Sequence, residues 1–235
     1  MRTINKGAKV GKQEISSNDL DKINLYALEP LTSDDVFTFK LAMSNNKIDR
    51  DFERMGIEAL TQLVELFKGR TIINDHSRST KNQCGRIYEC ELRTTDEILE
   101  NGEYFTELIA HCYMLNTDTN QDLIKEIKGG IKKEVSIGFQ IGSAVCSICG
   151  KDNMKESCSH WWGKEYDGKQ CYFTFSDVKD AYEVSFVAVP AVPGAGTTKE
   201  FKEAKEKAMN ESKLSAEKER QEQMMRIRLR LLEHI

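Results

Sequence analysis

Stretches rich in apolar residues, several of them alternating with polar ones, predict β-strands along much of the chain. In KKEVSIGF (132–139), Val135 and Ile137 would point to one face of a strand, and Ser136 and Gly138 to the other. Further strands are predicted at 36–43, 70–74, 86–93, 104–115, 171–175 and 181–191. We therefore expect a core that consists mostly of strands.

Two segments have the spacing of helices instead. Residues 57–69 place five apolar side chains at helical intervals and end in a glycine, Gly69; the five are Ile57, Leu60, Leu63, Val64 and Phe67. Residues 119–130 predict a short helix that ends in two glycines. The expected fold class is α+β, a mostly antiparallel β-barrel flanked by helices.

The composition changes at both ends of this core. Residues 1–30 begin with a polar, glycine-containing stretch and are predicted to be a flexible arm. PAVPGAGTT (190–198) holds two of the three prolines and predicts a domain boundary near residue 195. Residues 196–235 then form a separate segment, which has no Gly or Pro from 199 on and predicts a helix. The folded domain is therefore expected over residues 31–195.

Charge and length narrow the function classes. The 235 residues carry a formal net charge of −4, whereas a general nucleic-acid binder would usually be basic, so direct nucleic-acid binding is not expected. There is no apolar run of the roughly 20 residues that would span a bilayer, and no secretory signal pattern. We expect a reducing cytosolic setting without membrane contact, in which the seven cysteines are thiols or metal ligands.

Ser136 is a candidate nucleophile. The pattern around it fits an ordinary half-buried strand, or a reactive serine with Gly138 leaving room for a substrate backbone. An acyl-transfer serine requires a base within hydrogen-bond reach. Among the four histidines, only His76 stands in a polar loop directly after a predicted strand, where a rigid element would hold an exposed imidazole; the others are His111, His160 and His234.

Three stretches resemble a known family when they are taken in order. NDHSRSTKNQCGRI (74–87), KKEVSIGF and YEVSFVAVPAVPGA (182–195) are similar to the prohead, or capsid maturation, serine proteases of tailed bacteriophages. SNNKIDRDFERM (44–55) also resembles the polar Asp-Arg-Asp-x-Glu turn of that family. The resemblance covers roughly residues 36–195. It implies a fold similar to the herpesvirus assemblins, which are β-barrels ringed by helices.

The resemblance also implies roles for three residues. Ser136 matches the nucleophile, His76 the general base, and Glu183 the acidic residue that would orient the base. The third member stays open at this stage, because other carboxylates lie nearby in the sequence. These are Asp75, Asp177 and Asp180.

The biological setting that the resemblance implies is the interior of a phage procapsid in the cytoplasm of a bacterial host. The expected substrates are the scaffold, the N-terminal extension of the major capsid protein and the protease itself. A homodimer is a further expectation, because the herpesvirus relatives require dimerisation for activity. Residues 196–235 would then be an assembly segment or propeptide that self-cleavage removes.

A cysteine-rich insert at 146–171 predicts a metal site. Cys146 and Cys149 form a C-x2-C pair, and Cys158 and His160 form a C-x-H pair eight residues further on. Three thiolates and one imidazole would fill a tetrahedral structural zinc site and leave no open position for catalysis. Cys171 is a fifth candidate that could replace His160.

Two other functions remain open from the sequence. The chain could be a zinc-knuckle binding module in which the strand serine is only structural. It could also be a scaffold-type capsid assembly protein without catalysis, in which the C-terminal segment carries the function.

Overall fold

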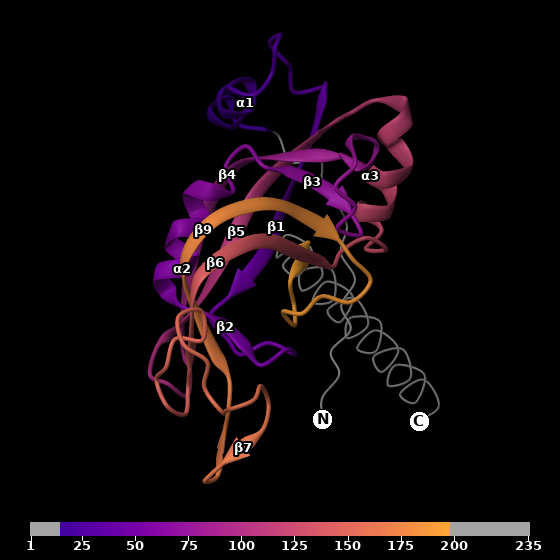
Figure 1. Ribbon diagram of the computed structural model, residues 1–235. Coiled ribbons are helices and arrows are strands. Elements are labelled where there is room, and N and C mark those ends of the chain that lie inside the picture. Colours follow the sequence, from indigo (N-terminus) through magenta and orange to yellow (C-terminus); the bar gives the residue numbers. More distant parts are fainter. Residues whose placement is uncertain (1–14, 198–235) are drawn as a thin grey trace, which may run out of the picture. The chain divides into compact units, whose positions relative to one another are not determined.

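The computed structural model describes residues 15–197, and its main element is one eight-stranded sheet (Figure 1). The strands of this sheet are β1 (Val36–Asn45), β2 (Glu53–Met55), β3 (Thr71–Asn74), β4 (Gly85–Ile98), β5 (Tyr104–Leu115), β6 (Val135–Cys146), β9 (Phe173–Phe186) and β10 (Gly196–Thr197). Their order is β10-β1-β5-β4-β3-β9-β2, with β6 paired to β9. Strands β7 (Glu165–Tyr166) and β8 (Lys169–Gln170) form a separate hairpin.

Strand β9 is the centre of the half of the sheet that contains β2, β3 and β6. Along one edge it pairs antiparallel with β6 from Phe173 to Phe186. Its other edge pairs in parallel with β2 at its beginning and with β3 at its end. The chain therefore brings the ends of β3, β6 and β9 together, although these strands lie far apart in the sequence.

The expectation of a closed barrel is wrong. Between the two ends of the sheet, within residues 15–197, the backbone contact is an isolated bridge between Glu134 and Gly196. Strand β10 has only two residues, which is too short to continue a ladder along β6. The α+β class with mostly strands is confirmed, but among the described residues the sheet stays open and leaves part of one edge of β6 without a strand partner.

Three α-helices are present in the described residues: α1 (Ser17–Asn24), α2 (Ile57–Leu66) and α3 (Gln121–Lys128). Two short 3-10 turns, η1 (Thr80–Asn82) and η2 (Asp118–Asn120), complete the elements. Helix α2 packs against β9, β4 and β5. It ends three residues before Gly69, which has a φ of 76° and turns the chain into β3.

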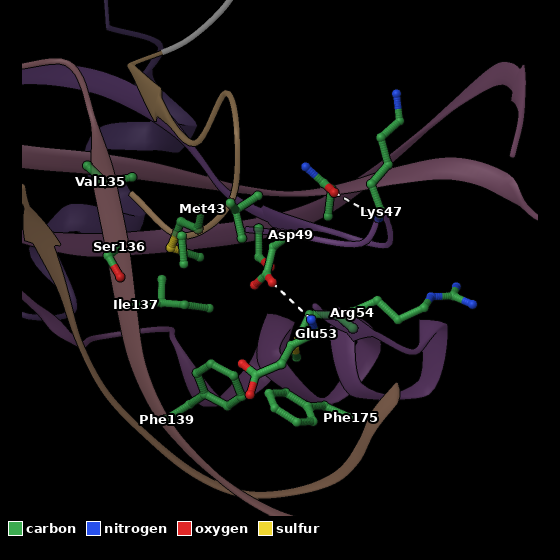
Figure 2. Close-up of a pocket in the computed structure, with 15 residues that line it drawn as sticks. Met43, Lys47, Asp49, Glu53, Arg54, Val135, Ser136, Ile137, Phe139 and Phe175 are labelled. Atoms are coloured by element: carbon green, nitrogen blue, oxygen red, sulfur yellow. Dashed lines mark hydrogen bonds between the residues drawn. The ribbon is translucent and has the colours of Figure 1, made fainter. Parts of the chain in front are cut away.

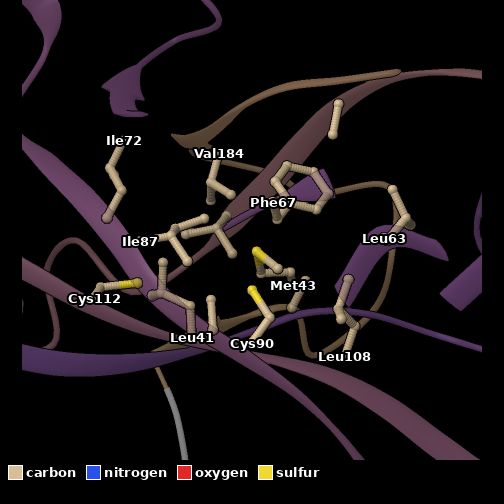
Figure 3. Close-up of a cluster of buried hydrophobic side chains, with 14 of the residues drawn as sticks. Leu41, Met43, Leu63, Phe67, Ile72, Ile87, Cys90, Leu108, Cys112 and Val184 are labelled. Atoms are coloured by element: carbon tan, nitrogen blue, oxygen red, sulfur yellow. The ribbon is translucent and has the colours of Figure 1, made fainter. Parts of the chain in front are cut away.

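The main core lies between α2 and the sheet (Figure 3). Leu60, Leu63 and Phe67 from the α2 region are fully buried against residues of the central strands, such as Leu41 and Val184. Burial of one such side chain contributes about 1.5–3 kcal/mol. This packing makes the sheet a rigid support for side chains on its other face.

Helix α1 lies inside the segment that the sequence predicts to be a flexible arm. The Ser16 side chain accepts a hydrogen bond from the Asp19 N–H at 3.1 Å and caps the helix. Ile23 is buried in a small cluster with Val36, Tyr88 and Tyr113. Leu20 is partly buried against the same cluster, so two apolar side chains anchor this short helix. Two apolar residues give too weak a periodic signal to predict it.

Within residues 15–197, no helix is long and apolar enough to cross a membrane. The helix and the assembly role expected for residues 198–235 lie outside the described residues.

Candidate active site and metal cluster

The register between β6 and β9 places two of the three candidate catalytic residues on one face of the sheet. Ser136 stands directly opposite Ser185, and Gly138 directly opposite Glu183. Opposite residues of an antiparallel pair share a face, and so do residues two apart along one strand. Ser136 and Glu183 are therefore diagonal neighbours on the face turned away from the core residue Val184.

A tight turn after β3 brings His76 to the same face. The Ser77 N–H donates to the Asn74 carbonyl at 3.0 Å, and Asp75 and His76 have φ values of 52° and 53°. Left-handed conformations at two non-glycine residues cost roughly 1–3 kcal/mol each and persist only where the surroundings impose them. Here the His76 N–H donates to Ser185 Oγ at 2.8 Å, which fixes the turn to β9.

His76 and Glu183 form a hydrogen-bonded pair. His76 Nδ1 lies 2.8 Å from Glu183 Oε1, and the two side chains are 43% and 2% exposed, respectively. A carboxylate at Nδ1 holds the imidazole in the tautomer whose Nε2 can accept a proton, and it stabilises the imidazolium that forms. Glu183 is thus a buried residue bonded to His76, and not an exposed strand residue without a partner. Its second oxygen, Oε2, is buried and has no hydrogen-bond partner among residues 15–197.

The other acidic candidates have different surroundings. Asp180 binds Arg70 at 2.8 Å, and Asp177 binds Lys179 at 2.7 Å. Asp75 is exposed in the turn itself. Of the acidic residues in the described part, Glu183 is the one that meets the His76 ring.

Ser136 shares the face of this pair, but within residues 15–197 no hydrogen bond joins its hydroxyl to the His76 ring. Bonds between a nucleophile and its base are often long without substrate and tighten only in the Michaelis complex. Ser143, Ser147 and Ser185 are the serines that compete with Ser136, and each has other contacts. Ser143 is buried, and its side chain hydrogen-bonds to Asp152. Ser185 is fully buried and donates to the Phe186 carbonyl, and Ser147 Oγ accepts from the Tyr172 N–H.

A pocket of about 160 Å³ adjoins Ser136 at the edge of β6 that β9 does not cover (Figure 2). Its walls are mostly apolar, and they come from β1, β2, β6, β9 and the loop before β10. They include Met43, Met55, Ile137, Phe139, Phe175 and Val192. Small-molecule sites measure roughly 300–1,000 Å³, so this pocket has the size for one side chain rather than for a cofactor.

Two acidic residues also line the pocket. Burial, followed by repulsion from Asp49 and Asp51, raises the pKa of Glu53 to about 7. Burial also raises the pKa of Asp49, although its Oδ1 accepts the backbone N–H groups of Asp51 and Glu53. Figure 2 shows the Glu53 carboxylate directed toward Phe139 and Phe175.

The turn that carries these acids is tied to the opposite wall of the pocket. Arg50 donates through Nη1 to the Pro190 carbonyl at 2.6 Å, and its backbone N–H donates to the Ala191 carbonyl. The sequence stretch 44–55 is therefore one wall of the pocket next to Ser136. The charge pattern of this stretch does not predict its place in the pocket, because Pro190, which Arg50 contacts, lies about 140 residues away in the sequence.

The cysteine-rich insert contains a cluster that could hold a metal ion. One donor atom from each of Cys146, Cys149, Cys158 and His160 lies within 4.8 Å of the others. Cys146 Sγ is 3.8 Å from His160 Nδ1, and a sulfur and a nitrogen ligand at zinc bond lengths in a tetrahedron lie about 3.6 Å apart. These four residues were expected from their spacing, and the structure brings them together.

Cys171 remains an alternative ligand. Its fully buried Sγ also lies 3.8 Å from Cys146 Sγ. Burial raises the pKa of Cys146, but hydrogen bonds from the backbone of Cys149 and Ile148 outweigh this, so its pKa lies below the ordinary value. A thiolate is the form that binds metal. Outside the insert, burial raises the pKa of Cys84 to about 11, which favours its neutral thiol.

The insert packs directly on the turn that lines the pocket. The Trp162 ring stacks on Phe173 with centroids 4.1 Å apart, and Phe173 pairs with Glu53 in the sheet. Gly163 sits against the ring of Phe52, so closely that a Cβ there would lie 2.5 Å from it. The metal cluster is thus connected to the pocket through a few aromatic side chains.

Scans against protein-family models, curated proteins and solved structures found no match for this chain.

Proposed function

We propose that this chain is a serine endopeptidase in which Ser136 is the nucleophile, His76 the general base and Glu183 the residue that orients the base. The observation that carries the proposal is the hydrogen bond of 2.8 Å between His76 and the buried Glu183, on the face of the sheet that bears Ser136. A buried carboxylate paired with a half-exposed imidazole beside a serine is the arrangement that acyl transfer requires.

In the proposed reaction, Ser136 Oγ attacks the scissile carbonyl carbon while His76 Nε2 takes the hydroxyl proton. The C–N bond then breaks, the same proton passes to the leaving amine, and an acyl-enzyme ester forms. Water then attacks the ester carbonyl carbon while His76 Nε2 takes a proton from it. The bond between the carbonyl carbon and Ser136 Oγ breaks, the proton passes to Oγ, and the acid product leaves. Glu183 keeps its hydrogen bond to Nδ1 and stabilises the imidazolium.

The pocket beside Ser136 would receive one side chain of the peptide. Its volume of about 160 Å³ and its mostly apolar walls fit a single residue next to the scissile bond. In the part of the chain that the structure describes, the middle of the β6 edge that β9 does not cover has no strand partner, and it would offer backbone groups to an extended peptide. Both features favour a polypeptide substrate over a small ester.

The resemblance to prohead proteases supports a more specific role. We infer processing of the scaffold, of the N-terminal extension of the major capsid protein and of the chain itself, inside the procapsid in the host cytoplasm. The cluster of Cys146, Cys149, Cys158 and His160 would hold a structural zinc ion, because four protein ligands leave no position for substrate. Zinc would there stabilise the insert and supply no catalytic chemistry.

A zinc-knuckle binding module is the second candidate, and the metal cluster favours it. Such a module would lose its function when Cys149 is replaced but would keep it when His76 is replaced. The acidic net charge of −4 counts against nucleic acid as its partner.

The test is mass spectrometry of the purified full chain, wild type beside Ser136→Ala, after co-expression with the coat and scaffold proteins. We expect fragments of all three proteins with the wild type and intact masses with Ser136→Ala. Thermal unfolding of both variants checks that Ser136→Ala still folds. Equal processing by a folded Ser136→Ala would overturn the proposal, and so would a complete lack of processing by the wild type.

A further inference from the structure

We propose that Gly138 is a positioning residue of the triad, whose missing side chain creates the space in which the Glu183 carboxylate meets His76. This inference rests on the proposed function. It replaces the sequence-based interpretation that Gly138 leaves room for a substrate backbone.

The evidence is the close approach of Glu183 to the backbone of β6. A Cβ at position 138 would lie 2.5 Å from Glu183 Oε1 and 3.3 Å from its carboxyl carbon. Real Cβ atoms essentially never come within 3.0 Å of another heavy atom, so one of the two groups would have to move. The displaced atom, Oε1, is the one that accepts the hydrogen bond from His76.

Backbone conformation does not explain this glycine. Gly138 is not among the glycines with positive φ, so its backbone is open to L-residues. The register supplies the reason instead, because Gly138 is the residue directly opposite Glu183. The requirement is therefore steric and local to the carboxylate.

Glu183 has little freedom to avoid an added methyl group. Its side chain is 2% exposed, and Arg78 Nη2 lies 3.6 Å from the same Cβ position. Arg78 is itself stacked over the Tyr182 ring at 4.5 Å. Restoring ordinary contact with a Cβ moves Oε1 by about 1 Å, and a misplacement of that size near a reacting centre can cost roughly 10²-fold in rate.

Gly142 provides a matched control in the same strand. A Cβ there would lie 2.3 Å from Asp177 Oδ2 and 2.5 Å from Lys179 Cε, which is at least as close. Both of these partners are about half exposed and can rotate into solvent. Gly142→Ala therefore tests the effect of adding a methyl group to β6 without disturbing the triad.

The experiment measures how fast a fluorophosphonate labels the full chain. In this reaction Ser136 Oγ forms a bond to phosphorus, fluoride leaves, and His76 takes the proton, so no peptide sequence needs to be known. We expect Gly138→Ala to lower the labelling rate roughly 10²-fold, and Gly142→Ala to leave it within about twofold. Equal rates for wild type and Gly138→Ala would overturn the proposal.

A double-mutant cycle separates positioning from a general loss of structure. If Gly138 acts through Glu183, Gly138→Ala added to Glu183→Gln will lower the labelling rate no further. A further loss of tenfold or more in that background would indicate a structural role and contradict the inference.

A proton NMR measurement distinguishes failure of this inference from failure of the proposed function. The Nδ1–H proton of a histidine bonded to a buried carboxylate resonates at low field, and His76→Ala assigns that signal. We expect Gly138→Ala to remove the signal and Gly142→Ala to retain it. This outcome holds even if no labelling occurs, whereas a signal retained in Gly138→Ala contradicts the positioning role.

Discussion

The triad face of the sheet and the cysteine-rich insert are held in place by different means. Ser136, Glu183 and the His76 turn are fixed by the backbone ladders of β3, β6 and β9, and these strands rest on a buried apolar core. The insert contributes only the two-residue strands β7 and β8, and most of its residues are at least partly exposed. Its order depends on a small cluster around Cys146 and Phe173 and on the donor set that could bind metal.

This difference indicates that substitutions on the triad face and substitutions in the metal cluster have different effects. A change on the triad face should stop catalysis while the chain stays folded, because none of the three side chains belongs to the main core. A change in the metal cluster should loosen the insert and reach the pocket through aromatic side chains, namely Trp162, Phe52 and Phe175. The following predictions test this separation, beginning with the largest effect.

Removing the Ser136 hydroxyl should cause the largest loss of activity. Ser136→Ala should reduce peptide hydrolysis by roughly 10⁶-fold, the loss typical of removing a nucleophilic serine. Ser185→Ala is the matched control, because Ser185 is opposite Ser136 in the sheet but buried. It should retain far more activity, although loss of its bond to the His76 N–H weakens the turn. Rates from the two purified variants decide the comparison, and a reversed order would exclude Ser136 as nucleophile.

Changing the carboxylate to an amide should have the next largest effect. Glu183→Gln keeps the size of the side chain but no longer favours the correct tautomer or stabilises the imidazolium, so kcat should fall roughly 10⁴-fold. Asp180→Asn is the control and should change kcat by less than tenfold, since Asp180 is bound to Arg70. A larger loss of kcat from Asp180→Asn would indicate that Asp180, and not Glu183, orients His76.

Metal removal should affect the insert rather than the chemistry. Native mass spectrometry should find one zinc ion per chain in the wild type, none in Cys149→Ser, and one in Cys84→Ser, whose thiol lies outside the cluster. Hydrogen exchange should then rise over residues 146–171 in Cys149→Ser, while the α2 region stays protected. Zinc retained at full occupancy by Cys149→Ser would contradict the assigned ligand set.

The smallest expected effect is the contribution of Glu53 to the pH dependence of stability. The pKa of this residue is raised in the folded chain from 4.5 to about 7, so the folded state binds more protons than the unfolded state between these values. Its contribution to stability is therefore fully present below pH 4.5 and is lost as the pH rises through 7. Asp49, Asp51 and the Trp162 indole are the groups that act on it.

Glu53→Gln should remove this part of the pH dependence. At pH 8 the variant should have a Tm about 2–4 °C above the wild type, a shift that corresponds to about 1 kcal/mol in a domain of this size. At pH 4 the two proteins should unfold at similar temperatures. Thermal unfolding at both pH values checks this, and a lower Tm of Glu53→Gln at pH 8 would contradict the sign.

Much of the secondary structure could be predicted from the apolar pattern. The strand expected at 104–115 is β5, and the helix expected from Ile57 begins at that residue. The stretches 171–175 and 181–191 were expected as two strands, but residues 173–175 and 181–186 belong to the one continuous strand β9, and residues 187–191 lie beyond its end. The polar residues between them contain Asp177, which has a φ of 55° but does not end the strand.

The partners of the catalytic candidates could be predicted only in part. The loop position of His76 follows from the sequence, whereas its acidic partner depends on the register of β9 against β3 and β6. That register shifts between Gly138 and Phe139 and again between Gln140 and Ile141, so counting along the strand does not show which carboxylate faces His76. The open sheet could not be predicted either, because its closure depends on pairing between β6 and β10, which are about 50 residues apart.

The most direct test of the central claim is a crystal structure of the full chain after reaction with a fluorophosphonate. The account predicts a phosphonate on Ser136 Oγ, with His76 Nε2 within about 2.6–3.2 Å of the phosphonate or Oγ and Nδ1 still bonded to Glu183. A phosphonate on another serine, or a His76 ring out of reach of Ser136, would contradict it.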